Sequence, residues 1–180
     1  ESSRTAKGTN VVNILELTEG EKVTAMLALS DYPENEYLTM VTRRGVIKRT
    51  PVCEFRMHRK GGKLAISLDE GDELWFVRRT KGEDEIVIAS ANGQAIRFSE
   101  RTVRPTGRTA RGVIGMELRE GDEVVGMTVV DLSRTLLTIT RKGYGKRTSF
   151  DDFRAMKNRG GIGVTCQKTS EKTGTLSSVI

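Results

Sequence analysis

The chain has 180 residues, of which 30 are basic and 24 acidic, and its formal net charge is +6. No apolar run approaches the roughly 18 residues that cross a membrane, and the N-terminus shows no signal-peptide pattern. With one histidine, the composition excludes a multi-histidine metal site, and the two widely separated cysteines have no metal-like spacing and indicate a reduced, cytoplasmic protein.

The first predicted element is a glycine-rich basic box followed by an acidic turn, and it recurs along the chain. The second and third copies align without a gap, the first has a few extra residues, and the last is the weakest. The copies lie near residues 4–21, 58–73, 108–123 and 158–168. Such self-similarity indicates an array of one structural unit rather than a set of independent segments.

Between the boxes the sequence predicts three β-hairpins, near residues 38–56, 85–104 and 136–154. Each hairpin has a glycine at its turn, an arginine four residues later and an apolar–arginine pair at its end. Residues 85–90 are rich in β-branched side chains and run into an Asn-Gly pair, which is a strong hairpin signal. Glycine suits these turns because it adopts a positive φ at little steric cost; the three are Gly45, Gly93 and Gly143.

The acidic turns lead into further strands. Glu-Gly-Asp at residues 70–72 and at 120–122 precedes predicted strands over 73–77 and 123–130. A short helical turn is expected at residues 150–156 and at the equivalent positions of the other units. We find no long segment with the 3.6-residue period of a helix.

Each unit therefore contains roughly four short strands in a period of about 50 residues, which is typical of propeller-like blades. We expect residues 1–180 to form one all-β domain, a partial array of these four-stranded blades. Three full periods plus one extra box indicate that the chain opens and closes within a blade. An incomplete ring is therefore expected rather than a closed propeller.

The repeat also predicts where charges gather. Acidic residues collect at the Glu-Gly-Asp turns, and basic residues collect in the boxes and in the second strands of the hairpins. If the blades stack side by side, equivalent positions line up into a basic rim, with an acidic edge elsewhere. The candidate DNA-binding residues are the basic side chains of the boxes and hairpins: Arg43, Arg44, Lys48, Arg49, Arg59, Lys60, Lys63, Arg97, Arg104, Arg108, Arg111, Arg141, Lys142, Lys146, Arg147, Arg154 and Arg159.

Two structural alternatives stand beside this interpretation. The charges can be ordinary solvated side chains of hairpin turns, and the box glycines can serve only to let neighbouring blades pack closely. A glycine that brings backbone amides to the surface beside arginines also suits phosphate contact, so both explanations of the glycines can hold.

Little in the sequence suits the reading of bases. Aromatic residues make up 5% of the chain and do not interleave with the basic clusters, and no recognition helix is evident. We therefore expect binding to the backbone of duplex DNA, independent of sequence and sensitive to salt. Carboxylate pairs occur only in the acidic turns without a base or metal partner, so no catalytic or metal site is predicted. The competing hypothesis is a protein-interaction module that uses the same charged edges.

Four stretches of the repeats are distinctive, and they begin at Gly107, Glu120, Gly143 and Glu171 and read GRTARGVIGM, EGDEVVGM, GYGKRT and EKTG. On these stretches the repeats resemble the C-terminal domain of the DNA gyrase A protein. The equivalent domain of topoisomerase IV is similar, but its repeats are more degenerate. The resemblance implies a β-pinwheel, in which neighbouring blades exchange strands, and the wrapping of duplex DNA round a basic rim in support of negative supercoiling.

The resemblance further implies a place in a larger bacterial enzyme, in the cytoplasm and associated with the nucleoid. ATP and Mg²⁺ would belong to that holoenzyme, and this chain is expected to carry no cofactor. The implied partners are double-stranded DNA, the remainder of the gyrase A protein, and the gyrase B protein. The family's box of roughly QRRGGKG belongs to its first blade, whereas residues 58–64 match a later blade's version, so the first and last blades are expected to lie outside this chain.

Overall fold

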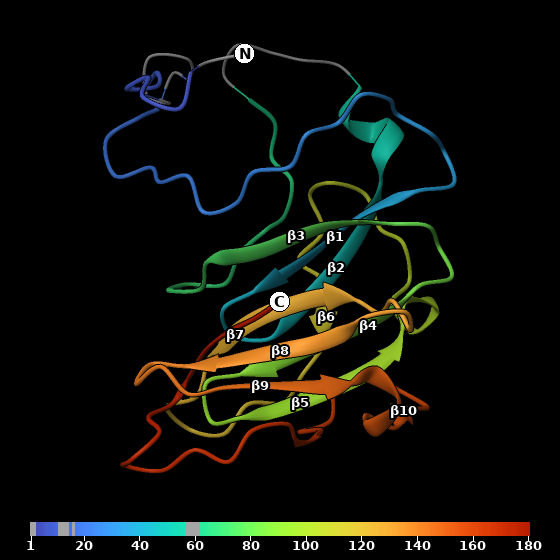
Figure 1. Ribbon diagram of the computed structural model, residues 1–180. Helices are drawn as coiled ribbons and strands as arrows, with labels where there is room; N and C mark the ends of the chain where they lie inside the picture. Colours follow the sequence, from blue (N-terminus) through green and yellow to red (C-terminus); the bar gives the residue numbers. More distant parts are fainter. Residues whose placement is uncertain (1–2, 11–14, 16, 57–61) are drawn as a thin grey trace.

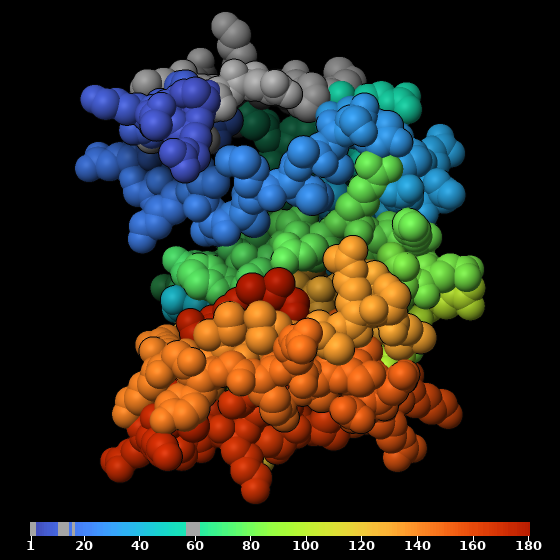
Figure 2. Space-filling model, in the orientation of Figure 1, coloured from blue at the N-terminus to red at the C-terminus, as the bar shows by residue number. Residues whose placement is uncertain are grey.

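The computed structural model describes residues 3–10, 15, 17–56 and 62–180. In these residues the regular structure is β-sheet with three short 3-10 turns, so the all-β prediction is confirmed. The sheets stack in chain order, from the N-terminal segment at one end to the third sheet at the other (Figures 1 and 2).

We call the three sheets blades 1, 2 and 3. Blade 1 has the strand order β3 (Leu74–Thr80), β1 (Tyr37–Thr42), β2 (Val46–Pro51) and β6 (Val113–Ile114). Blade 2 has the order β7 (Val124–Val129), β4 (Glu85–Ser90), β5 (Gln94–Ser99) and β10 (Ala155–Met156), and β11 (Val164–Thr165) also pairs with β5. Blade 3 has the order β12 (Leu176–Val179), β8 (Thr135–Thr140) and β9 (Gly145–Ser149).

The central hairpins and the strands after the acidic turns lie where the sequence predicts them. The turn glycines have φ of +84° at Gly45, +80° at Gly93 and +82° at Gly143, as expected. The expected helical turn after each hairpin is a single 3-10 turn: η2 (Val52–Phe55), η3 (Glu100–Thr102) and η4 (Phe150–Asp152). In η3 and η4 a serine just before the turn accepts a backbone N–H, from Arg101 and Asp151 respectively.

Neighbouring blades exchange strands. β6 comes from the box at residues 108–123, which follows the second hairpin, yet it pairs with β2 of the first. In the same way β10 and β11, from residues after the third hairpin, both pair with β5 of the second. Blades 1 and 2 therefore each consist of their own hairpin, the strand after the next acidic turn, and strands from the box region of the following unit.

Two box glycines make this exchange possible. Gly112 has φ +105°, and a Cβ placed on it would lie 2.7 Å from the carbonyl oxygen of Ile47. Gly163 has φ +85°, and a Cβ there would lie 2.2 Å from the carbonyl oxygen of Ala95. A side chain at either position would collide with the backbone of the preceding blade, so close packing is one reason for these glycines.

Apolar side chains fill the spaces between blades. One cluster, including Ile47, Phe98 and Met116, lies between blades 1 and 2, and another, including Val87 and Leu136, lies between blades 2 and 3. Strands β3, β7 and β12 each stand at one end of the strand order of their sheet. Strand β7 contacts both β3 and β12, and we call the side formed by these three strands the inner edge. The exchanged strands β6, β10 and β11 lie at the opposite side, which we call the outer edge.

The two ends of the array differ from its middle. Residues 22–30 follow an acidic turn, as β3 and β7 do, but form no strand, because no described hairpin is present for them to pair with. At the other end, no described strand lies on the outer side of β9. The described sheets therefore form an arc, as expected, and do not close into a ring.

Candidate nucleic-acid interface

The hairpin turns lie beside the acidic turns. β3 runs antiparallel to β1 and its first residue, Leu74, pairs with Thr42, so the acidic turn before β3 meets the hairpin turn after β1. Arg43 consequently forms ion pairs with Glu73 at 3.2 Å and with Glu123 at 3.8 Å. The expected separation of a basic rim from an acidic edge is therefore wrong at the hairpin turns.

The other basic residues of these turns have similar surroundings. Arg44 donates to the carbonyl oxygen of Glu70 at 3.0 Å, and Arg141 lies 3.6 Å from Glu123. Lys142 donates to the carbonyl oxygen of Glu171. The charges of this end of the molecule are mixed, and the field of its arginines is partly cancelled.

Lys48 is buried between two boxes, although the sequence analysis placed it on the rim. Only 1% of the residue is exposed, and Nζ donates to the carbonyl oxygens of Ala65 at 2.7 Å and Arg108 at 2.5 Å. Burial lowers the pKa of Lys48 below its usual value, and the nearby positive charge of Arg108 acts in the same direction. The ammonium group therefore holds the box at residues 108–123 against strand β2.

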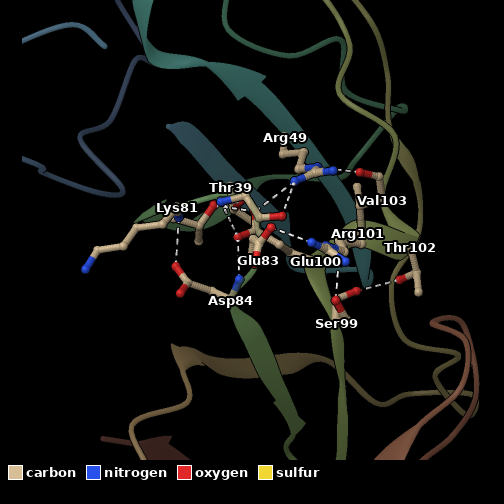
Figure 3. A network of polar contacts seen from close by, with 12 residues as sticks. Thr39, Arg49, Lys81, Glu83, Asp84, Ser99, Glu100, Arg101, Thr102 and Val103 are labelled. Atoms are coloured by element: carbon tan, nitrogen blue, oxygen red, sulfur yellow. Dashed lines mark hydrogen bonds and ion pairs between the residues drawn. The ribbon is translucent and has the colours of Figure 1, made fainter. Parts of the chain in front are cut away.

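Arg49 is buried next to Lys48, in the network of Figure 3. Its Nε donates to the carbonyl oxygen of Val103 at 2.5 Å, and Nη1 lies 3.1 Å from the carboxylate of Glu100. Glu100 is fully buried and also accepts the hydroxyl of Thr80 at 2.7 Å and the N–H of Gly82 at 2.7 Å. The guanidinium group therefore serves as an internal link between blades 1 and 2.

Arg97 occupies the equivalent place in blade 2. Its Nη1 donates to the carbonyl oxygens of Phe150 at 2.7 Å and Phe153 at 3.2 Å, and Nε donates to Glu85 at 3.0 Å. The side chain is 11% exposed. Arg147, the third residue of this series, is exposed on β9 together with Lys146.

The arginines of the boxes link consecutive boxes; Arg108 and Arg159 are half-buried and Arg111 is exposed. Arg108 donates to the carbonyl oxygen of Leu64 at 3.3 Å, and Arg159 donates to the equivalent oxygen, that of Ile114, at 2.6 Å. Arg111 is exposed and pairs with Asp69, whose hydrogen bond raises the pKa of Arg111 further.

The first of these boxes is only partly described. Lys63 is half-buried, and its Nζ lies 3.4 Å from the carbonyl oxygen of Glu54. The predicted site residues Arg59 and Lys60 lie outside the described residues.

Arg104 and Arg154 remain as exposed arginines whose side chains contact no described acidic group or carbonyl. Each follows its 3-10 turn and opens an outer segment: residues 104–111 in one unit and 154–159 in the next. Neither outer segment contains an acidic residue, and each contains three basic ones. Strand β10 lies within the second segment, and β6 begins two residues after the first. Both strands are at the outer edge, so this basic charge lines that edge.

Sequence reasoning missed one member of this series. Arg56 is exposed and lies seven residues after its hairpin arginine (49 to 56), as Arg104 and Arg154 do (97 to 104 and 147 to 154). The repeat register was the signal that could have identified it. Lys157, exposed in the second outer segment, was also missed.

Neither a metal centre nor a membrane-spanning helix is found in the described part of the chain. There, no group of three or more His, Cys, Asp or Glu side chains could hold a metal ion. No helix of these residues is long and apolar enough to span a bilayer. A groove of about 450 Å³ beside β9, lined by Lys146, Cys166 and Lys168, is open to solvent and holds no cluster of reactive groups.

Comparison with known families accounts for the repeat. The model of the DNA gyrase C-terminal domain, a beta-propeller, matches residues 1–30, 36–81, 84–131 and 134–180. The chain belongs to this family. The gyrase resemblance seen in the sequence is thereby confirmed, and so is the pinwheel-like fold with its exchanged strands.

Known gyrase A proteins and solved domains are similar over nearly the whole chain. The DNA gyrase A protein of Staphylococcus aureus is 45% identical over 177 residues, 97% of this chain, and that of Staphylococcus epidermidis is 43% identical over 98% of it. The chain spans only 20% of the length of either relative.

Two solved structures are similar to this chain in fold. A DNA gyrase A C-terminal domain has a TM-score of 0.86 at 29% identity, with 97% of this chain and 58% of that chain covered. The C-terminal domain of a DNA topoisomerase IV has a TM-score of 0.87 at 26% identity, with 96% and 54% covered.

Proposed function

We propose that this gyrase-family chain binds duplex DNA along its outer edge, through the phosphate backbone, and holds the duplex bent around that edge. The observation that carries the proposal is the repeated outer segment, which contains basic residues and no acidic ones. Both outer segments begin with an exposed arginine without a described partner, Arg104 and Arg154, and the exposed Arg56 holds the same place in the preceding unit.

The structure divides the predicted basic residues into three groups. Lys48, Arg49 and Arg97 donate to internal carbonyl oxygens and are left out of the proposed contact surface. The arginines at the hairpin turns lie among carboxylates and contribute weakly. The exposed arginines that open the outer segments remain as the main phosphate contacts, supported by Lys157. The box arginines Arg108, Arg111 and Arg159 contribute less, because they already bond to backbone carbonyls or to Asp69.

The chemistry of this surface suits the backbone rather than the bases. Arginine forms charge-assisted, bidentate hydrogen bonds with phosphate oxygens. The described residues include no α-helix that could enter the major groove. Binding through phosphates is expected to release counterions and to fall steeply with salt.

Contacts repeated from blade to blade favour a bent duplex. Bending a site of 20–30 base pairs costs about 1–6 kcal/mol, depending on the angle. A straight duplex would touch a curved outer edge at one blade, whereas a bent duplex reaches the arginines of successive blades. Each added contact therefore offsets part of the free-energy cost of bending. Within a gyrase holoenzyme, such wrapping would support negative supercoiling.

The context of the proposed activity follows from the relatives, which are gyrase A proteins. The 45% identity to gyrase favours that enzyme over topoisomerase IV as the parent. We place the chain with the remainder of the gyrase A protein and with the gyrase B protein, in the bacterial cytoplasm on nucleoid DNA. ATP and Mg²⁺ belong to the holoenzyme in this proposal, and no cofactor is assigned to the chain.

A mobility-shift titration with a linear duplex of random sequence tests the proposal. The triple variant Arg56→Ala, Arg104→Ala, Arg154→Ala should lose most of the affinity, and its log–log salt slope should be smaller by about 0.9 for each lost phosphate contact. The matched control is Arg43→Ala, Arg44→Ala, Arg141→Ala, which removes the same charge from the mixed hairpin-turn end and should retain most binding.

Equal losses in the two triple variants would show that only net charge matters and would contradict an outer-edge site. If the wild-type chain ignores duplex DNA even at low salt, the protein-interaction hypothesis takes its place.

A further inference from the structure

We infer that the arginine of each of the first two hairpins is a positioning residue for the exposed arginine of the following unit: the buried Arg49 for Arg104, and the largely buried Arg97 for Arg154. The inference rests on the proposed contact between these exposed arginines and DNA. It assigns a binding-related role to two residues that the rim interpretation had placed at the surface.

The geometry in blade 1 is direct. Arg49 Nε donates to the carbonyl oxygen of Val103, and the next residue is Arg104. Arg49 Nη1 pairs with Glu100, the first residue of η3, so the guanidinium holds both the start of the 3-10 turn and the residue after it. Within the turn, the N–H of Val103 donates to the carbonyl oxygen of Glu100 at 2.9 Å.

Blade 2 repeats the arrangement with different partners. Arg97 Nη1 donates to the carbonyl oxygens of Phe150, the first residue of η4, and Phe153, the residue before Arg154. Position 150 is a phenylalanine where the preceding unit has Glu100, and the contact there is made by the backbone oxygen instead of a carboxylate. Arg97 therefore still bonds to the first residue of the 3-10 turn, although that residue has no carboxylate in this unit.

The link fixes the backbone of the exposed arginine because a peptide unit is planar. The carbonyl oxygen of Val103 lies in one rigid plane with the nitrogen and Cα of Arg104. The oxygen of Phe153 is related to Arg154 in the same way. A guanidinium held in the core and bonded to that oxygen therefore sets where the exposed side chain leaves the surface, and it sets this relative to the preceding blade.

A positioning role and a purely stabilising role predict different dependences between substitutions. If Arg97 only stabilises the fold, its loss should weaken DNA binding without regard to which exposed arginine is present. If it positions Arg154, the contribution of Arg154 should depend on Arg97, while that of Arg104 should not. A double-mutant cycle measures this dependence.

The experiment uses the whole chain and a random-sequence duplex at low salt. Arg154→Ala should weaken binding about tenfold in the wild type, but only about twofold in an Arg97→Gln background. Arg104→Ala, held by Arg49, should weaken binding by the same factor in both backgrounds. Arg97→Lys, which keeps a long donor side chain, should restore part of the dependence. Equal factors for Arg154→Ala in both backgrounds would overturn the inference.

A second measurement needs no DNA. Amide hydrogen exchange followed by mass spectrometry should show faster exchange of residues 150–156 in Arg97→Gln, with residues 100–106 unchanged. Unchanged exchange in 150–156 would overturn the inference even if DNA binding fails. If residues 150–156 exchange faster in Arg97→Gln but the wild-type chain binds no duplex, the link between Arg97 and Arg154 is supported and the proposed function is wrong.

Discussion

The guanidinium of Arg49 and the carboxylate of Glu100 lie 3.1 Å apart between blades 1 and 2, with side chains 7% and 0% exposed. Arg49 also stacks over the ring of Tyr37, its guanidinium carbon 4.5 Å from the ring centre. Both partners have further hydrogen bonds, so the pair is fully satisfied in the interior. Such a pair adds modest stability when intact, but breaking it is expensive because one charge stays buried.

Arg49→Leu should therefore lower the free energy of unfolding by about 3–5 kcal/mol. Urea unfolding followed by the fluorescence of the single tryptophan, Trp75, measures the change. The control is Arg101→Ala, which removes the exposed ion pair with Glu83 and should cost below about 1 kcal/mol. Similar midpoints for the two variants would mean that the buried pair is not the link that the geometry indicates.

Lys48 should make stability depend on alkaline pH. Its pKa is lowered from 10.5 by burial, so between the lowered value and 10.5 the unfolded chain binds more protons than the folded one. The stability contributed by this group therefore rises with pH across that window. In Lys48→Met this rise should be absent, which chemical unfolding of both proteins at pH 8 and at pH 10 can measure. Parallel pH profiles would contradict the assignment.

The two cysteines should differ in reactivity. Burial raises the pKa of the Cys166 thiol to about 11, so about one thiol in a thousand is ionised at pH 8. Cys53 is less buried, and iodoacetamide at pH 8 should modify it first, as mass spectrometry of tryptic peptides would show. The difference should disappear in denaturant. Equal rates in the native protein would indicate that β11 leaves blade 2 readily.

Gly163 should tolerate no side chain. Its positive φ and the nearby oxygen of Ala95 predict that Gly163→Ala costs more than about 1–3 kcal/mol, the usual size of backbone strain alone. Gly161→Ala is the control, because its Cβ would make only ordinary contacts, with the side chain of Ile96 at 3.7 Å and the backbone nitrogen of Gly163 at 4.0 Å. Thermal unfolding compares the two. A destabilised Gly161→Ala with an unaffected Gly163→Ala would contradict the described exchange of strands.

The sequence determined the repeat, the hairpins with their glycine turns, the strands after the acidic turns, and the family. These features follow from local chemistry: a turn needs a positive φ, and a strand needs β-branched and alternating residues. The repeat register that relates Arg56 to Arg104 and Arg154 is also present in the sequence. These three arginines were recognised as one series only when the structure showed that all three are exposed.

Only the tertiary structure decided which basic side chains face solvent. The tripeptide Lys-Arg-Thr occurs twice at the same place in the repeat, at Lys48 to Thr50 and at Lys146 to Thr148. In blade 1 its lysine and arginine are buried, and in blade 3 both are exposed. The box at residues 108–123 covers β2 and supplies one of the two carbonyl oxygens that Lys48 bonds, whereas no described strand covers β9. Identical local sequence thus has opposite surroundings, because burial depends on what packs against a strand and not on the strand alone.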